Sequence, residues 1–321
     1  MGLKTLEAIK SWVARALGRL GEVKPLRRLG EVRYLTGLAR SAGCSLTVGK
    51  GVVAVRCGDR EIRLSRKNYV YAQDLIKNFE YYFGVVEPRR ESSLKVADYS
   101  KPALHTMCGD GLPFWFPELP ESMETTGIYL DRAGLGAGQT VLDLGAYAGG
   151  ATYHFSRAVG LDGRVFAFEP DPTSFECLVK NIALHELANV VPLRLGVWSE
   201  SGRVAFQAEG NMGSAVVEAA DRSSDSRQWI DVVSLTDFCR ERAIERVDFV
   251  KMDVEGSEAP ILGASGDFIR RYRPSMIIEV HRVRGIRSDA DVTRILAAHG
   301  YSVEVVDQAG LELPLLFARP G

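Results

Sequence analysis

The chain has 321 residues, of which 46% are hydrophobic and 25% charged, a balance typical of a globular protein with a sizeable core and not of a disordered or fibrous one. Its 40 basic and 41 acidic residues give a formal net charge of -1, so composition favours no nucleic-acid partner. At about 150 residues per domain, the length suggests two units.

Positive charge is concentrated at the start of the chain. Residues 1–40 contain nine basic side chains and three acidic ones. Apolar residues recur at intervals of three and four from Leu3 to Leu20, which predicts an amphipathic helix ending at Gly21. A basic face opposite Trp12 is typical of helices that lie on anionic lipids, although a helix packed on its own protein shows the same pattern. We therefore expect residues 1–40 either to pack internally or to contact the inner face of a membrane peripherally.

The cysteines and the apolar runs indicate a cytoplasmic protein. The five cysteines are scattered without a C-x-x-C pair, so we expect reduced thiols and neither a disulfide framework nor a zinc site. No apolar run approaches the roughly 18 residues that a membrane span requires. Lys4, Glu7 and Lys10 stand where a signal peptide is apolar, so we expect neither secretion by that route nor integration into a membrane.

Residues 1–90 are predicted to form an accessory region of helices and a β-meander. Short alternating runs between glycines predict three strands, at 45–48, 52–56 and 61–64, and helical spacing returns over 69–83. Charged residues, Gly84 and Pro88 interrupt the apolar pattern near 85–95, which places the boundary of a second domain, 91–321, after residue 90. The accessory region is expected to shape an acceptor site, to mediate homodimerisation or to dock at a membrane.

Beyond residue 120, apolar strand-like runs alternate with helical segments. This alternation predicts a parallel sheet covered by helices on both faces, with ligands where strands end and helices begin. The expected strands are 140–144, 164–169, 190–196, 247–253, 275–281 and 301–306, with further strands at 203–207, 214–219 and 229–233. The expected helices are 149–159, 172–185, 234–241, 257–269 and 289–299.

The segment 141–150, VLDLGAYAGG, predicts a nucleotide site that is not of the dinucleotide type. Asp143 and Gly145 lie at the end of an apolar strand, and small residues then open a helix, so the backbone can approach a ligand closely. A dinucleotide fold would place a second glycine at Tyr147 to admit a pyrophosphate. A nicotinamide cofactor is therefore disfavoured.

The next strand, in the segment VFAFEPDP at 165–172, delivers a second carboxylate. Glu169 at its end can accept hydrogen bonds from both hydroxyls of a ribose. A ribose acceptor without a phosphate cradle predicts an adenosine that lacks phosphates, and S-adenosylmethionine fits this description. The alternative is that the glycines are ordinary helix-entry turns and Glu169 a solvated end residue.

At this point the sequence resembles the FkbM family of S-adenosylmethionine-dependent methyltransferases. The resemblance covers about residues 120–283, and its most distinctive stretch is KMDVEGSE at 251–258. The other matching stretches are Val141–Gly149 with Ala151 and Thr152, Val165–Pro172 with Leu178 and Asn181, and Pro274–His281. Both the content and the order of these stretches match.

The resemblance implies a class I methyltransferase fold, a Rossmann-like, seven-stranded, mostly parallel sheet whose antiparallel last strand would lie near 312–317. It also implies transfer of a methyl group to a hydroxyl of a sugar, a glycolipid or a secondary metabolite, with S-adenosylhomocysteine as the product. Asp143, Gly145 and Ala146 would line the methionine end of the donor, and Glu169 its ribose. The family commonly has Asn where this chain has Tyr147, so an aromatic contact would replace an amide one.

A second group of polar residues follows two later strands. Asp253 ends the strand at 247–253, Glu255 follows in the loop, and Glu279 and His281 end the neighbouring strand at 275–281. Because the carboxyl ends of parallel strands meet at one edge, we expect these residues near Asp143. His281 is predicted to be the general base for the acceptor hydroxyl, with its ring oriented by Asp253 or Glu279.

Several of these acids have structural alternatives. Glu255 and Glu258 also suit the first turn of a helix, and His281 also suits a local hydrogen bond at a strand end. A divalent metal on Asp253, Glu279 and His281 agrees with the ligand types, but no tight ligand spacing supports it, and no metal is favoured. Before the first core strand, Glu124 is expected to meet the donor's ammonium group, although Glu121 and Glu124 also suit a helix start.

Three functions therefore remain for comparison. The favoured one is an O-methyltransferase with a small-molecule, glycan or lipid-linked acceptor. The second is a binding or scaffold protein that keeps the fold without turnover, against which the presence of Asp143, Glu169, Asp253 and His281 argues. The third is a nicotinamide-dependent oxidoreductase, which Tyr147 disfavours.

Overall fold

The computed structural model describes residues 24–121, 123–207, 215–216, 227–283, 286–308 and 314–321. The chain divides into two compact units, one formed by Met1–Phe83 and Pro88–Ala97 and the other by Gly84–Glu87 and Asp98–Gly321. Within the described part of the chain, no helix combines the length and the apolar character needed to cross a membrane. The helix predicted over residues 3–20 lies outside the described residues.

The first unit is built on a five-stranded sheet in the order β1-β2-β3-β5-β4. Alternate residues of its central strands, such as Val53, Val55, Ile62 and Leu64, are buried, because a two-residue period turns one face of a sheet toward the core. The strands are β1 (Ser45–Val48), β2 (Val52–Cys57), β3 (Arg60–Ser65), β4 (Arg89–Glu91) and β5 (Leu94–Tyr99). The predicted meander is therefore present.

The helices of this unit differ from the expected ones. The helix α2 (Lys24–Ser41) was not predicted, because its sequence has no clear apolar stripe. The single helix expected over 69–83 is divided into three short pieces. They are η1 (Arg66–Tyr71), α3 (Ala72–Lys77) and α4 (Phe79–Gly84), and Asn78 stands between the last two in a non-helical conformation.

A disulfide joins Cys44 to Cys57, and the expectation of reduced thiols throughout is wrong for this pair. The two residues continue the register of β1 and β2, in which Ser45 faces Arg56, and their Cα atoms lie 4.4 Å apart. Only the hairpin register brings them together, which their spacing in the sequence does not reveal. The pair Cys44–Cys57 therefore gives no support to a reducing compartment.

The second unit contains a seven-stranded sheet in the order β10-β9-β8-β15-β16-β20-β19. The first five strands run parallel, and β20 is antiparallel to both of its neighbours. The strands are β8 (Thr140–Leu144), β9 (Arg164–Phe168), β10 (Val190–Leu193), β15 (Phe249–Met252), β16 (Ser275–Glu279), β19 (Tyr301–Val306) and β20 (Leu315–Pro320). This is the mostly parallel sheet with one reversed strand that was expected.

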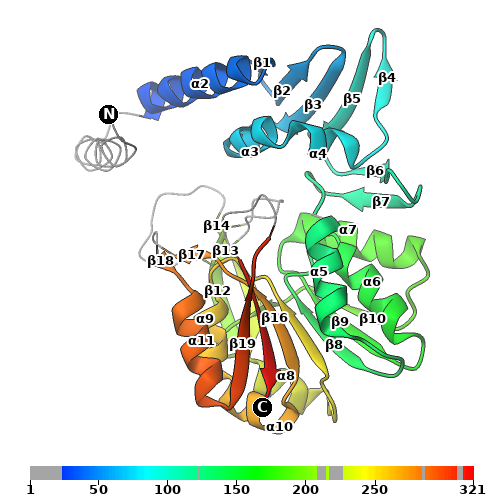
Figure 1. Ribbon diagram of the computed structural model, residues 1–321, viewed down its shortest axis with the longest axis vertical. Helices are drawn as coiled ribbons and strands as arrows, with labels where there is room; N and C mark the ends of the chain where they lie inside the picture. The colour runs from blue at the N-terminus through cyan, green and yellow to red at the C-terminus, as the bar shows by residue number, and fades with distance from the viewer. Residues whose placement is uncertain (1–23, 122, 208–214, 217–226, 284–285, 309–313) are drawn as a thin grey trace. The chain divides into compact units, whose positions relative to one another are not determined.

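Helices cover both faces of this sheet (Figure 1). One face packs against α5 (Met123–Ala133), α6 (Gly150–Val159) and α7 (Pro172–Leu184), through residues such as Tyr129, Phe155 and Leu178. The other face packs against α8 (Leu235–Glu241), α9 (Glu258–Ala264), α10 (Gly266–Tyr272) and α11 (Asp289–Ala298), through residues such as Phe238, Ile261 and Leu296. The strands are apolar on both faces because each face is buried.

Smaller elements complete the unit. The helix expected over 257–269 is two helices, α9 and α10, which meet at Ser265. The hairpin of β6 (Ala103–Thr106) and β7 (Pro113–Phe116) precedes α5, and β17 (Arg282–Val283) pairs with β18 (Ile286–Arg287). A four-stranded sheet is formed by β11 (Gly196–Val197), β14 (Arg227–Val233), β12 (Gly202–Gln207) and β13 (Ala215–Val216).

Candidate functional site

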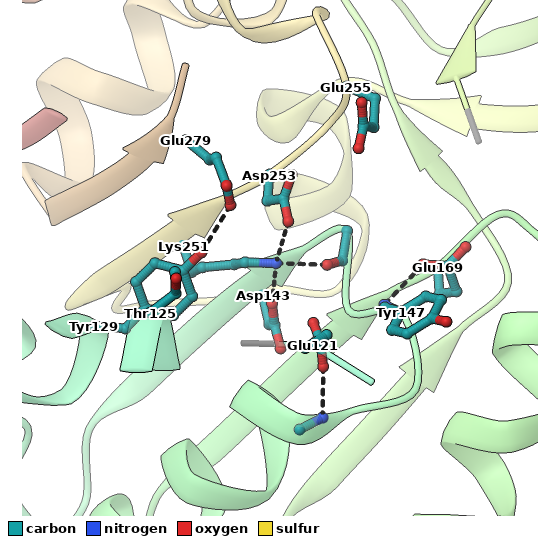
Figure 2. A network of polar contacts seen from close by, with 12 residues as sticks. Glu121, Thr125, Tyr129, Asp143, Tyr147, Glu169, Lys251, Asp253, Glu255 and Glu279 are labelled. Atoms are coloured by element: carbon teal, nitrogen blue, oxygen red, sulfur yellow. Dashed lines mark hydrogen bonds and ion pairs between the residues drawn. The ribbon is translucent and has the colours of Figure 1, made fainter. Parts of the chain in front are cut away.

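The predicted site residues meet at the carboxyl ends of four neighbouring strands of the seven-stranded sheet. Asp143 lies in β8, Glu169 directly follows β9, Asp253 directly follows β15, and Glu279 ends β16. Figure 2 shows these carboxylates around the loop that leaves β8, with Lys251 among them. The parallel arrangement therefore gathers them at one edge, as the order of the strands requires.

The loop after β8 passes against the end of β15 so closely that residue 145 must be glycine. Gly145 has a φ of 79°, and a Cβ atom there would lie 1.8 Å from the carbonyl oxygen of Asp253. The backbone N–H groups of Gly145 and Ala146 donate to the carbonyl of Phe168, at 3.0 and 2.8 Å. The loop is thus fastened to β9 on one side and lies against β15 on the other.

Tyr147 takes up a left-handed backbone conformation in this loop. Its φ is 48°, a value that non-glycine residues seldom adopt and that Asn tolerates better than most. Its hydroxyl donates to the carbonyl of Leu119 at 2.8 Å, and only 5% of the residue is exposed. The side chain is therefore fixed within the protein, and the part of Tyr147 that reaches the predicted ribose site is its backbone.

Glu169 is held at that site by two backbone groups. Its Oε2 accepts from the N–H of Tyr147 at 2.8 Å, and its Oε1 accepts from the N–H of Asp171 at 2.7 Å. Burial raises the pKa of Glu169 to about 8. Because a carboxylate oxygen can accept two hydrogen bonds, each oxygen keeps the capacity to accept one more.

Lys251 is a buried cation at this site. It opens the KMDVEGSE stretch, but the sequence alone predicted no role for it. Its Nζ donates to the carbonyl of Gly145 at 2.6 Å and lies 3.6 Å from Asp143 Oδ1 and 3.5 Å from Asp253 Oδ2 (Figure 2). Burial by itself lowers the pKa of Lys251, but Asp253 and Asp143 raise it above its usual value, so the side chain is charged. Its place two residues before Asp253, on the same face of β15, is the signal that could have revealed it.

Asp143 is fully buried beneath the loop. Its other oxygen, Oδ2, accepts a hydrogen bond from Thr152 of α6, and burial raises its pKa. The register of the sheet pairs Asp143 with Lys251 on the adjacent parallel strand. In this structure Asp143 supports the loop from below and is not exposed at its surface.

Of the two acids predicted near the start of α5, the structure brings Glu121 to the loop. Its Oε2 accepts from the N–H of Gly150, the first residue of α6, at 3.1 Å. Burial raises the pKa of Glu121 to about 8. Glu124 belongs to the first turn of α5, but its side chain lies outside the described residues.

His281 follows β16 and is held by a buried glutamate. Its Nδ1 lies 2.7 Å from Oε1 of Glu258, which is fully buried and also accepts from the N–H of Gly256 at 2.9 Å. The expectation that Asp253 or Glu279 orients this ring is thus corrected: the orienting carboxylate is that of Glu258. Glu258 begins α9, as its alternative as a helix-start acid implied, but its side chain also binds His281 at the edge of the sheet, which was not predicted.

The other ring nitrogen of His281 is directed at two carboxylates. Nε2 lies 3.5 Å from Asp253 Oδ1 and 3.5 Å from Glu255 Oε2. Burial lowers the pKa of His281, but the hydrogen bond to Glu258 and the charges of Glu255 and Asp253 raise it to about 10. At neutral pH the ring therefore carries a proton in this arrangement.

Glu279 lies at the same edge but has a different partner. Its Oε2 accepts from the hydroxyl of Tyr129 in α5 at 2.9 Å (Figure 2). Burial raises the pKa of Glu279 to about 7. Its contact thus ties α5 to the sheet edge.

A pocket with about 390 Å³ of empty space, part of it open to solvent, adjoins this edge within the second unit. Its accessible wall is mostly apolar and includes several aromatic rings, which suits an apolar face of a ligand. Glu121 and Gly150 belong both to this wall and to the loop region described above. The lining residues are Met107, Asp110, Leu112, Phe114, Phe116, Glu121, Thr126, Gly150, Tyr153 and His154.

The strand order, with one reversed strand beside β16 and a glycine loop after β8, defines the class I methyltransferase fold. Within this fold class, the sequence of the chain matches one family. A family model described as the methyltransferase FkbM domain matches residues 143–303, half of the chain. The chain belongs to this family, as its motifs had indicated.

The chain is similar to two named methyltransferases from different organisms. It is 28% identical over 141 residues to the hexuronic acid methyltransferase AglP of Haloferax volcanii, a match that covers 44% of this chain and 56% of AglP. It is 29% identical over 215 residues to the 31-O-demethyl-FK506 methyltransferase FkbM of Streptomyces tacrolimicus, covering 57% of this chain and 81% of that protein. The match to AglP thus spans little more than half of AglP's length.

Among solved structures, the chain is similar to a methyltransferase FkbM from Methylobacillus flagellatus. The two are 19% identical with a TM-score of 0.41, and the match covers 56% of this chain and 43% of that one.

Proposed function

We propose that this protein transfers the methyl group of S-adenosylmethionine to a hydroxyl oxygen of a small molecule, such as a sugar, a glycolipid or a secondary metabolite. The observation that carries the proposal is the carboxylate of Glu169, held by two backbone N–H groups at the tip of β9 beside a glycine loop. That arrangement can accept both hydroxyls of a ribose, and the loop has Tyr147 where a pyrophosphate-binding loop has its second glycine.

Of the residues proposed around S-adenosylmethionine, some contact it and others hold the glycine loop in place. In the proposal Glu169 binds the ribose, and Gly145 and Ala146 lie along the methionine end. Asp143, buried and paired with Lys251, acts from beneath the loop. Tyr147 contributes through its backbone N–H to Glu169.

A carboxylate is also needed for the donor's ammonium group. We assign this role to Glu121, because its side chain already lies at the first turn of α6 beside the loop. Glu124, expected from the sequence for the same role, stays a prediction.

The acceptor hydroxyl is proposed to lie at the edge formed by Asp253, Glu255 and His281. Its oxygen attacks the methyl carbon in line with the C–S bond, the O–C bond forms as the C–S bond breaks, and S-adenosylhomocysteine leaves. The hydroxyl proton passes to the carboxylate of Asp253; His281, predicted from the sequence as the general base, could take it only after losing the proton that it carries at neutral pH. Glu279, the third predicted catalytic residue, acts as a positioning residue through its hydrogen bond with Tyr129.

The names of two relatives bear on the acceptor, and only the FK506 one specifies an oxygen, since a hexuronic acid offers a carboxylate as well as hydroxyls. One is named for a hexuronic acid and the other for the 31-O-demethyl form of FK506.

The proposal is tested by isothermal titration calorimetry of the full chain with S-adenosylmethionine, S-adenosylhomocysteine and NAD. Binding of the first two and not of NAD supports it, whereas binding of NAD alone would favour an oxidoreductase. Incubation with methyl-labelled donor and a metabolite extract then separates an enzyme from a scaffold. Label released only on cleavage of an ether supports methylation of a hydroxyl, whereas label released on hydrolysis of an ester places the methyl group on a carboxylate and contradicts the proposal.

Three further expectations accompany the proposal. Peripheral membrane contact through residues 1–40, homodimerisation and a cytoplasmic location stay predictions from the sequence. Residues 1–23 lie outside the described part of the chain. Partitioning on anionic liposomes at low salt, with and without residues 1–20, tests the first of them.

A further inference from the structure

We propose that Asp253, Glu255 and His281 bind one divalent cation, which holds the acceptor's oxygen beside the donor. The inference rests on the proposed function and adds a cation to the site. Its three side chains come from the ends of β15 and β16, the part of the edge next to the donor loop.

The geometry of the three side chains is that of a ligand set. One ligand atom from each residue can be chosen so that all three lie within 4.8 Å of one another, and His281 Nε2 is 3.5 Å from each carboxylate oxygen. Ligands about 2.0–2.2 Å from a common ion lie roughly 3 Å apart, so a small inward shift completes the set. The side chains of His281, Asp253 and Glu255 are 16%, 26% and 29% exposed, so one side of the group is open to an acceptor.

A separate observation concerns the far nitrogen of His281. Metal-bound histidines usually donate their other ring N–H to a carboxylate or carbonyl, which fixes the ring and directs the free nitrogen at the ion. Here the fully buried Glu258, which is not a member of the ligand set, holds Nδ1 at 2.7 Å. Glu258 is itself held by Gly256 N–H, and Ser288 Oγ lies 3.3 Å from its second oxygen.

Acidic side chains outnumber basic ones at this edge of the sheet. Four acidic side chains, those of Asp253, Glu255, Glu258 and Glu279, lie around Lys251 and His281 (Figure 2). Lys251 pairs with Oδ2 of Asp253, whereas Oδ1 of the same carboxylate faces His281. Burying unpaired negative charge is costly, and a divalent ion on the open side offsets it.

The ligand types select the class of cation. Two carboxylates and one imidazole suit a first-row divalent ion such as Mn²⁺, Co²⁺ or Zn²⁺ better than Mg²⁺, which prefers oxygen ligands. Three protein ligands leave positions for water and for the acceptor. An alcohol bound there is more acidic than in water, so the ion would assist loss of the hydroxyl proton.

The test is a Mn²⁺ titration of the full chain, freed of metal with a chelator, in which free Mn²⁺ is followed by electron paramagnetic resonance. One bound ion per chain is expected for the wild type and for Glu245→Gln, an exposed carboxylate away from the site. Glu258→Gln is expected to weaken binding about 10–100-fold, and Glu255→Gln at least as much. Wild-type binding no stronger than that of Glu255→Gln overturns the cation site.

Titration with S-adenosylhomocysteine, measured on the same samples, separates the two proposals. Bound S-adenosylhomocysteine without bound Mn²⁺ overturns the cation site and leaves the methyltransferase proposal standing. Loss of S-adenosylhomocysteine binding by the wild type overturns the proposed function instead. If Glu255→Gln unfolds, the visible absorption of Co²⁺ in the wild type and in His281→Gln decides, because imidazole coordination alters that spectrum.

Discussion

The proposed donor end of this site, around Glu169, and its proposed acceptor end, around His281, are built in different ways. At the donor end, Glu169 and the loop after β8 are held by backbone N–H groups that lie within a few residues of the strands themselves. At the proposed acceptor end, Nδ1 of His281 is held by a glutamate from α9, and two carboxylates face its Nε2. The comparison teaches that backbone anchors can be inferred from local sequence, whereas a cluster of side chains from separate elements cannot.

Lys251 joins the two ends, and its loss should have the largest effect. Lys251→Met leaves Asp143 and Asp253 without their shared cation and removes the hydrogen bond to Gly145, so we expect a loss of about 3–5 kcal/mol in the free energy of unfolding. Denaturant unfolding measures it. The matched control is Lys180→Met, an exposed lysine of α7, which should change stability by less than about 1 kcal/mol. Equal losses of stability in the two variants would contradict the role of Lys251 as the cation that joins the two ends.

Gly145→Ala tests how closely the two ends approach. The added Cβ collides with the carbonyl of Asp253 and also meets an unfavourable φ, so we expect a loss of about 2–3 kcal/mol or more, together with loss of S-adenosylhomocysteine binding.

Gly138→Ala is the control for this substitution. Gly138 has the same φ of 79° but no neighbouring atom within 4 Å of an added Cβ, so only the conformational cost of about 1–2 kcal/mol remains. Denaturant unfolding of both variants separates collision from strain, and equal losses would contradict the close approach.

Glu169→Gln should affect the donor end alone. Hydrogen bonds to a charged group contribute about 1.5–3 kcal/mol, so affinity for S-adenosylhomocysteine should fall about 10–100-fold while Mn²⁺ binding is kept. Glu255→Gln should show the reverse pattern. Calorimetry on both variants, with the exposed Glu176→Gln as a control, checks the separation, and a drop in both ligands for either variant would contradict it.

The smallest expected effect is the release of protons when S-adenosylhomocysteine binds beside Glu169. Burial raises the pKa of Glu169 to about 8, so the carboxyl is mostly protonated at pH 7 without ligand. Ribose hydroxyls favour the ionised form, so binding of S-adenosylhomocysteine should release protons at pH 7 and few at pH 9. Its affinity should therefore rise with pH up to about 8 and then level off. Calorimetry in buffers of different ionisation enthalpy measures the release, which Glu169→Gln should reduce.

The same raised pKa also predicts a trend in stability. A carboxyl whose pKa is higher in the folded protein binds its proton more tightly there, so its contribution is present below the unfolded value of 4.5 and is lost as pH rises through about 8. Wild-type protein without ligand should lose stability over this window, and Glu169→Gln should lose less. A stability that rises over the same window in the wild type alone would contradict the assignment.

Much of the fold and of the donor end could be predicted from the sequence. Apolar runs with intervening helical periods located all six core strands expected for the seven-stranded sheet, and the reversed last strand, expected near 312–317, is β20 (Leu315–Pro320). The glycine of the loop and the acid after β9 follow from positions next to strand ends. These features depend on neighbours in the chain, and a pattern of neighbours is what a sequence displays.

Only the tertiary structure decided which side chains meet. The register of β8 and β15 pairs Lys251 with Asp143, the start of α9 brings Glu258 to His281, and the hairpin of β1 and β2 joins Cys44 to Cys57. In each case the partners are distant in the chain or belong to different elements. Strand register and helix placement determine such contacts, and hydrophobic periodicity carries no information about either.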